Sequence, residues 1–164
     1  MDIRKISFIE PGAPGLHIFS KFPIPRLGAV LLSTILRERG YNVKTFIEDL
    51  ASLDWSFIKS SDIVCISTVT STAIKAYRIG KRLKVLNIPV IMGGAHPTFL
   101  PDEALEYADF VIRGEGEHSL VELLEFMDKG VPALRDIKGF SYRNRDGESE
   151  GDTVSNALRP RLRN

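Results

Sequence analysis

Short apolar runs that alternate with helical segments constrain the fold of this chain more than any other feature of its sequence. Isoleucine and valine dominate the runs, as is typical of strands buried on both faces of a parallel sheet. The runs occupy residues 5–9, 43–47, 63–67, 90–92 and 110–112. Strands that alternate with helices along the chain predict an α/β fold.

The segments between the runs have apolar residues at helical spacing. Longer helices are predicted at residues 27–39, 72–86 and 117–129, and shorter helical turns at residues 55–59 and 102–107. The residues that share one face of the first helix are Leu27, Leu31, Leu32, Ile35 and Leu36. Gly40 and Gly130 follow the first and third longer helices and predict where these helices end.

Right-handed crossovers leave few ways to connect parallel strands in one sheet. Because the chain offers five strands and not six, we predict a three-layer, doubly wound parallel sheet with the flavodoxin-like order 2-1-3-4-5. Residues 138–154 predict an appended C-terminal β-hairpin, since residues 140–143 are strand-like and Asp146-Gly147 is a strong turn signal. The polar residues 143–164 lead us to expect a fragment of a longer protein.

Composition excludes several classes of protein. The net charge is +1, so nothing indicates a surface for nucleic acid or for an acidic membrane. The chain has one cysteine, Cys65, which excludes an internal disulfide framework and favours a reducing, cytoplasmic location. No apolar stretch approaches the ~20 residues that span a bilayer.

Ligands of open parallel sheets bind beyond the carboxyl ends of the strands, so the loops at that edge matter most. Gly93-Gly94 and Gly114-Glu115-Gly116 each follow a predicted strand there, and glycine lets another group approach the backbone closely. A single glycine turn is explained as a tight connection between a strand and a helix, whereas two such turns side by side at the same mouth, on the carboxyl edge of the sheet, favour a ligand site. Residues 67–72 contain five hydroxyls in six positions, more than a helix cap requires, and favour a polar ligand.

The titratable residues of these loops also have ordinary explanations. His17, His96 and His118 lack the partner spacing of a zinc site, and a lone histidine usually packs or forms hydrogen bonds. Glu117 suits the start of a helix, whereas Glu115 stands between two glycines at the mouth. The sequence contains no P-loop and no nucleophile elbow. We therefore predict no catalytic and no metal-ligating residue.

Four segments together resemble the N-terminal cobalamin-binding domain of B12-dependent radical S-adenosylmethionine (SAM) enzymes. They are PRLGAVLLSTILRERGYNVKTFIEDLA, GGAHPTFLPDEAL, ADFVIRGEGEHSLVELL and IKGFSYRNRDG. The resemblance covers nearly the whole chain, residues 5–155, and the paired GGxHPT and GEGE signals make it specific. Some members of this family are named anaerobic magnesium-protoporphyrin monomethyl ester cyclases.

The resemblance implies that cobalamin lies over the carboxyl ends of the strands, with its nucleotide tail extending into the domain. Together with the loop pattern, it predicts contacts with this corrinoid from Ser67, Thr68, Thr70, Ser71, Gly93, Gly94, Ala95, His96, Thr98, Gly114, Glu115, Gly116 and Glu117. It assigns residues 1–135 to a cobalamin-binding, Rossmann-like domain. Residues 136–164 then form the hairpin and a truncated linker toward a missing radical SAM domain of the same parent chain.

The parent is expected to be a methyltransferase or a cyclase whose missing part holds SAM and a 4Fe-4S cluster. This chain alone is not expected to be catalytic, because one cysteine cannot supply the CxxxCxxC motif of that cluster. Other B12 domains carry DxHxxG after the first strand, with a histidine that ligates cobalt. The surroundings of His17 do not match that motif, so we predict that His17 does not ligate cobalt.

Two other interpretations remain open. A flavodoxin-like, flavin-binding domain would use the hydroxyl-rich residues 67–72, although the loop after the first strand is long and rich in proline. A cofactor-free, partner-docking domain is the third interpretation. Its receiver-like version needs an aspartate at the end of the third strand, where this chain has Ser67-Thr68.

Overall fold

The computed structural model describes residues 3–13, 26–144 and 151–160. Its strands are β1 (Lys5–Glu10), β2 (Asn42–Ile47), β3 (Ile63–Ser67), β4 (Val90–Gly93), β5 (Phe110–Ile112), β6 (Phe140–Arg143) and β7 (Thr153–Ser155). Its α-helices are α1 (Leu27–Glu38), α2 (Trp55–Lys59), α3 (Ala73–Val85), α4 (Ala95–Phe99), α5 (Pro101–Ala104) and α6 (Glu117–Lys129). Short 3-10 turns, η2 (Thr70–Thr72) and η3 (Leu134–Asp136), complete the described elements.

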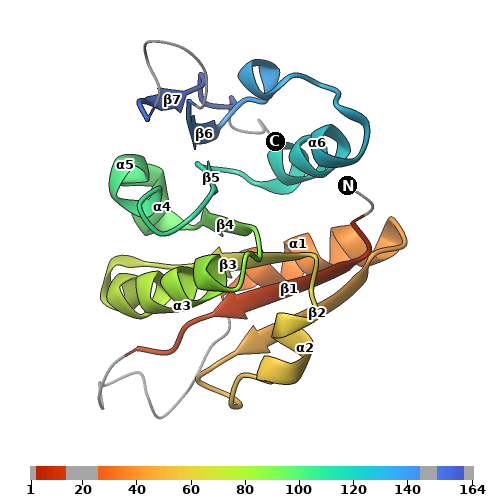
Figure 1. The fold of residues 1–164 in the computed structure, drawn as a ribbon, viewed down its shortest axis with the longest axis vertical. Helices are drawn as coiled ribbons and strands as arrows, with labels where there is room; N and C mark the ends of the chain where they lie inside the picture. The colour runs from red at the N-terminus through yellow and green to blue at the C-terminus, as the bar shows by residue number, and fades with distance from the viewer. Residues whose placement is uncertain (1–2, 14–25, 145–150, 161–164) are drawn as a thin grey trace.

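One sheet with the order β2-β1-β3-β4-β5-β6-β7 runs through the molecule. The first five strands are parallel and follow the predicted order 2-1-3-4-5. The hairpin strands β6 and β7 continue this sheet antiparallel from β5, so the hairpin lengthens the sheet at that edge. In Figure 1 the strands follow one another from β2 at the bottom to β6 and β7 at the top. The predicted turn at Asp146-Gly147 lies outside the described residues, as does His17.

Two apolar layers, one on each face of the sheet, form the core. Helices α2, α3 and α5 supply buried side chains to one layer, and α1 and α6 supply them to the other (Figure 1). Ile9 and Ile66 face the first layer, while Phe8 and Cys65 face the second. Successive strand residues therefore point to opposite faces, and both faces are apolar because both are covered.

The ends of the helices agree with the glycine signals. Gly40 has a φ of +89° just beyond α1, and its N–H donates to the carbonyl of Arg37. Gly130 has a φ of +77° directly after α6, and its N–H donates to the carbonyl of Phe126. Glycine adopts this left-handed conformation without the steric cost that a Cβ imposes.

The apolar face of α1 differs from the one that the sequence predicts. Leu36 is buried, but Leu27 is 80% exposed and Leu31 is 46% exposed. The buried stripe of α1 instead runs through Ala29, Ser33 and Leu36. The small side chain of Ala29 stands near the carboxyl edge of the sheet, and space remains beside it.

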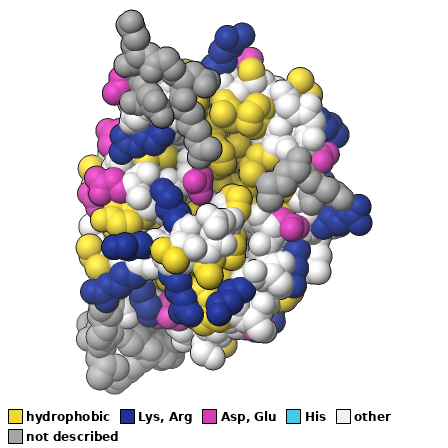
Figure 2. All heavy atoms as spheres, in the orientation of Figure 1, with side chains coloured by type: hydrophobic (Ala, Val, Ile, Leu, Met, Phe, Trp, Pro, Cys, Tyr) yellow, Lys and Arg dark blue, Asp and Glu magenta, His cyan; other side chains and the backbone are white. Residues whose placement is uncertain are grey.

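Basic side chains of the second predicted helix are exposed, as expected for a solvated face. Arg78, Lys81 and Lys84 are exposed on α3, and the Arg82 guanidinium lies 3.7 Å from the centre of the Trp55 ring. Figure 2 shows that basic side chains are interspersed with apolar and uncharged ones on this face. Among the described residues, no helix combines the length and the apolarity that crossing a membrane requires.

Candidate functional site

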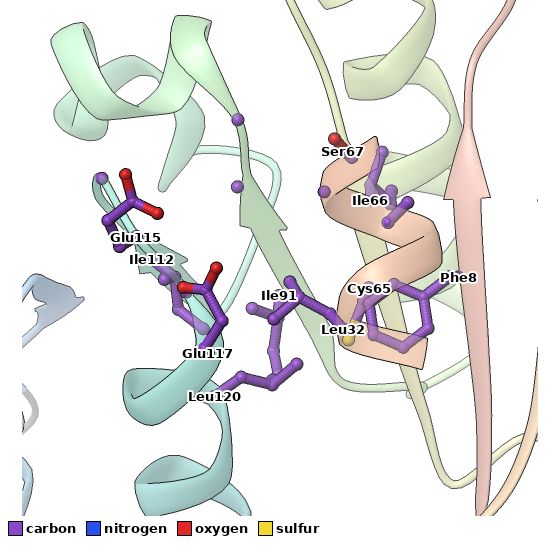
Figure 3. Close-up of a pocket in the computed structure, with 16 residues that line it drawn as sticks. Phe8, Leu32, Cys65, Ile66, Ser67, Ile91, Ile112, Glu115, Glu117 and Leu120 are labelled. Carbon is purple, nitrogen blue, oxygen red and sulfur yellow. The ribbon is translucent and has the colours of Figure 1, made fainter. Parts of the chain in front are cut away.

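Both glycine turns open onto one cavity at the carboxyl edge of the sheet. Gly93 and Gly94 line it from the end of β4, and Gly114 and Gly116 line it from the connection between β5 and α6. The cavity has a volume of about 160 Å³ and is bounded by α1 on one side and α6 on the other (Figure 3). The two turns that sequence analysis singled out therefore share one mouth.

The side chain of Thr98 joins the two turns directly. Its hydroxyl donates to the carbonyl of Gly94 over 2.8 Å and accepts from the N–H of Gly114 over 3.0 Å. One hydroxyl thus satisfies a backbone group in each turn. This bridge fixes the spacing between the turns, because both hydrogen bonds depend on the same oxygen.

Gly94 is required by the packing of backbone against backbone. Its φ is +99° and its ψ is −176°, a combination that is essentially restricted to glycine. A Cβ at this position would lie 2.5 Å from the carbonyl oxygen of Thr68. The turn after β4 can therefore lie against the turn after β3 only because no side chain intervenes.

The cavity is polar at its mouth and apolar at its floor. In Figure 3, the carboxylate of Glu115 and the hydroxyl of Ser67 lie toward the carboxyl ends of the strands, and the carboxylate of Glu117 lies lower, on the α6 side of the cavity. Deeper side chains that line the cavity are Phe8, Leu32, Cys65, Ile91 and Leu120. An elongated ligand with an apolar end and a polar end matches this gradient.

Strand register explains how the floor is built. Phe8 of β1 pairs with Cys65 of β3, and Cys65 pairs with Ile91 of β4, so the three side chains lie at one level on one face. Cys65 is a free thiol that is 5% exposed, and burial raises its pKa above the ordinary value of 9.0. The thiol stays protonated and acts as a small apolar wall of the cavity.

Most hydroxyls of residues 67–72 are engaged within the protein. Thr68 and Thr72 are buried, and their hydroxyl oxygens lie 2.7 Å apart. The Thr72 hydroxyl also accepts from the backbone N–H of Val69, which closes the turn before α3. Only Ser67 of this run lines the cavity, while Thr70 and Ser71 are exposed at the same edge of the sheet.

His96 is buried away from the cavity, among side chains of α3 and its neighbours. One ring nitrogen lies 2.8 Å from the Tyr77 hydroxyl and the other lies 3.2 Å from the Thr70 hydroxyl. The Glu103 carboxylate is 3.6 Å from the first nitrogen. Burial and then the hydrogen bond to Glu103 raise the pKa of Tyr77 above its ordinary 10.0. These contacts hold the turn after β4 onto α3.

The predicted contact residues therefore fall into two groups. Those that line the cavity are Ser67, Gly93, Gly94, Gly114, Glu115, Gly116 and Glu117. Those outside its lining are Thr68, Thr70, Ser71, Ala95, His96 and Thr98. Thr98 and His96 nevertheless hold the turns that form the mouth, whereas Ala95 is exposed beside them.

Sequence analysis missed an ion pair beside the cavity. The Glu10 carboxylate, at the end of β1, is buried and accepts from the backbone N–H of Arg26. The Arg26 guanidinium lies 3.5 Å from that carboxylate and donates to the carbonyl of Ser67 over 3.2 Å. The sequence signal for this pair was Glu10, an acidic residue at the end of an apolar strand. This pair connects β1, α1 and β3 where the cavity opens.

A larger groove, of about 740 Å³, lies at the opposite edge of the sheet. Phe110 and Tyr142, which pair at the amino end of β5, form part of its wall. The smaller cavity is the candidate ligand site, because parallel α/β sheets bind ligands at the carboxyl ends of their strands. Within residues 3–13, 26–144 and 151–160, no group of three or more His, Cys, Asp or Glu side chains is arranged to hold a metal ion.

Several relatives, including the following two, match most of the chain. An uncharacterized methyltransferase of Pyrococcus horikoshii is 37% identical over 130 residues, which are 73% of this chain and 28% of that protein. The anaerobic magnesium-protoporphyrin IX monomethyl ester cyclase of Rubrivivax gelatinosus is 32% identical over 160 residues, which are 88% of this chain and 28% of that protein. The chain thus spans well under a third of the length of either relative.

A third relative matches a shorter stretch. The bacteriochlorophyllide d C-12(1)-methyltransferase of Chlorobaculum tepidum is 47% identical over 62 residues, which are 38% of this chain and 14% of that protein. A family model described as a B12 binding domain matches residues 18–124. This match covers β2 to β5, α1 and most of α6, and so includes both glycine turns. The chain belongs to the B12 binding domain family.

Proposed function

We propose that the chain binds cobalamin at the carboxyl edge of its sheet, with the nucleotide tail in the cavity between α1 and α6. The observation that carries the proposal is that two glycine turns, joined by Thr98, open onto one cavity that is polar outside and apolar inside. Family membership supports the choice of ligand. In this proposal, the residues predicted from the sequence contact the cofactor or hold in place the residues that do.

The residues present fit one part of the cofactor. A cavity of roughly 150 Å³ lined by Leu, Ile and Phe is known to hold a benzene ring, and this one has about 160 Å³ with a similar lining. The broad corrin ring exceeds that volume, so it must remain outside, over the turns. Gly114 leaves the backbone bare at the mouth, since a Cβ added there would meet no atom within 4 Å.

Polar groups at the mouth suit the polar groups of a corrinoid. Glu115 and Glu117 offer carboxylate oxygens that accept from amide and hydroxyl groups. Within the described part of the chain, no side chain caps the start of α6, so its first N–H groups are left to donate to a ligand or water. When bound, cobalamin supplies a cobalt centre that can carry a methyl group. The chain's own part is to bind the cofactor, orient it and shield its tail from water.

We further propose that the parent protein is a B12-dependent radical SAM enzyme, a methyltransferase or an enzyme like the ester cyclases. Relatives named as a methyltransferase and as ester cyclases support the type of reaction, and the sequence resemblance described above supports the radical SAM class. SAM and the 4Fe-4S cluster would bind in a radical SAM domain of the same parent chain. Residues 1–135 would form the cofactor-binding part, and residues 136–164 the hairpin and connection. A cytoplasmic location is supported by the single cysteine, a buried free thiol.

Titration of the purified 164-residue chain with hydroxocobalamin tests the proposal. We expect co-elution on gel filtration and a change in the visible spectrum of the corrinoid. Gly116→Leu places a side chain between Leu32 and Ile112, because a Cβ at position 116 already lies 3.3 Å and 3.5 Å from their side chains. We therefore expect weaker binding by this variant.

His118→Leu provides the matched control, because His118 is exposed on α6 and lies outside the cavity lining. It should bind as the unaltered chain does. Absence of binding by a folded chain would refute the proposed function. Equal binding by Gly116→Leu and His118→Leu would refute the cavity as the site. Isolation of the chain with bound flavin would favour the flavodoxin-like interpretation instead.

A further inference from the structure

We propose that the cavity selects among corrinoids by their lower base, preferring an apolar benzimidazole-type base to adenine. The inference rests on the proposed function, since it requires the nucleotide tail to enter the cavity. It adds a specificity that the family assignment does not contain. The determinants are side chains of β1, β3, β4, α1 and α6 that meet at the cavity floor.

The side chains of the floor carry no nitrogen or oxygen atom. Phe8, Leu32, Ile91 and Leu120 are hydrocarbon, and the Cys65 thiol is only a weak donor and acceptor. The strand backbone offers nothing more, because β1, β3 and β4 are paired with one another through this level of the sheet. A group that enters the floor must therefore leave its hydrogen-bonding partners in water.

Two polar groups of the cavity, those of Ser67 and Glu115, are at its other end, where Figure 3 shows their oxygen atoms on the side of the carboxyl ends of the strands. The Glu117 carboxylate lies lower, on the α6 side, across the cavity from Phe8 and Cys65. These groups can accept from the sugar or from the amides of a corrinoid. Ser67 and Glu115 do not lie beside Phe8, Cys65 and Ile91, where the far edge of a base would come to rest.

The two kinds of base differ in what burial removes from water. A dimethylbenzimidazole presents methyl groups and ring carbons at its far edge, which pack on Phe8, Ile91 and Leu120 without loss. Adenine presents an exocyclic amine and ring nitrogens, which would be buried without partners. Leaving such groups unpaired weakens binding by roughly 5- to 150-fold.

The test compares three corrinoids on the purified 164-residue chain by equilibrium titration. Cobalamin carries dimethylbenzimidazole, adeninylcobamide carries adenine, and cobinamide lacks the nucleotide. We expect cobalamin to bind roughly 5- to 150-fold more tightly than adeninylcobamide. Cobinamide, which cannot fill the cavity, should bind at least about 10-fold more weakly than cobalamin.

The outcomes separate this inference from the proposed function. Binding of cobalamin and adeninylcobamide with equal affinity would overturn the selectivity while leaving cobalamin binding intact. Equal affinity for cobinamide and cobalamin would show that the tail does not enter the cavity, which also overturns the inference. If none of the three binds to the folded chain, both proposals fail.

A pair of neighbouring substitutions tests the floor itself. Leu32→Gln adds an amide to the cavity wall at a half-buried position of α1, so the fold should tolerate it. We expect the preference for cobalamin over adeninylcobamide to fall by about 5-fold or more, because the amide can pair with adenine. Leu31→Gln is the control, because Leu31 is 46% exposed and outside the lining. If both variants change the preference alike, the floor does not set the selectivity.

Discussion

Replacement of Gly94 by alanine tests how the two glycine turns are held. The native φ of +99° and ψ of −176° cost a residue with a Cβ about 1–3 kcal/mol. The new Cβ would also lie 2.5 Å from the Thr68 carbonyl oxygen and 3.0 Å from the Thr68 nitrogen. These are backbone atoms within the packed turn after β3, and relieving such overpacking costs about 1–3 kcal/mol.

The two contributions sum to about 2–6 kcal/mol, a large part of the roughly 5–15 kcal/mol by which a domain is stable. With a urea dependence of about 2 kcal/mol per molar, the midpoint of unfolding should fall by about 1–3 M. Urea titration followed by far-ultraviolet circular dichroism measures this shift. The same variant should bind hydroxocobalamin more weakly, because relief of the clash moves the turn at the cavity mouth.

Two other glycines give matched controls. Gly114 has a φ of +74°, and a Cβ added there would meet no atom within 4 Å, so Gly114→Ala should cost only the conformational strain, about 1–2 kcal/mol. Gly28 has ordinary helical geometry and equally open space, so Gly28→Ala should change stability by less than about 1 kcal/mol. If Gly94→Ala proves no more destabilising than Gly114→Ala, the argument from backbone contact is refuted.

Three further predictions concern other residues of the site. Thr98→Val should lower the free energy of unfolding by about 1 kcal/mol and weaken hydroxocobalamin binding, because the N–H of Gly114 loses its acceptor. Thr98→Ser should retain the stability and the binding of the unaltered chain. Urea and corrinoid titrations measure these effects. His96→Ala and Tyr77→Phe should both lower the urea midpoint, because each variant loses the hydrogen bond between His96 and Tyr77. A fall in corrinoid binding without loss of stability would contradict this structural role. Because burial raises the pKa of the Cys65 thiol, the unfolded chain ionises first as pH rises above 9.0. The free energy of unfolding should then fall by about 1.4 kcal/mol per pH unit relative to that of Cys65→Ala. If the difference in urea midpoint between the two chains stays constant between about pH 8 and 10.5, this prediction is contradicted.

Local signals were sufficient to predict the order of the parallel strands. The Ile- and Val-rich runs marked strands that are covered on both faces, and the glycines at 40 and 130 marked the ends of α1 and α6. The two glycine turns were predicted to share a mouth because parallel strands end at one edge, and they do line one cavity. These features depend on short stretches of sequence and on general rules of chain connection.

Features that depend on contacts between distant segments were not predicted. The hydroxyl of Thr68 was predicted to contact a ligand, but in the structure it pairs with the hydroxyl of Thr72. The apolar face of α1 was misplaced because periodicity cannot show that Leu27 and Leu31 are exposed while Ala29 faces the sheet. The cavity floor was also missed, since only strand register brings Cys65 beside its neighbours on β1 and β4.

Hydrogen exchange measured by mass spectrometry, with and without hydroxocobalamin, tests the central assignment most directly. Amides that close over a bound group exchange more slowly, and the method locates them along the chain. We predict that the cofactor slows exchange in residues 91–99 and 112–120, which carry the two glycine turns, and in residues 27–33 of α1. Slower exchange confined to the groove beside Phe110 and Tyr142, or no change at saturating cofactor, would contradict the assignment.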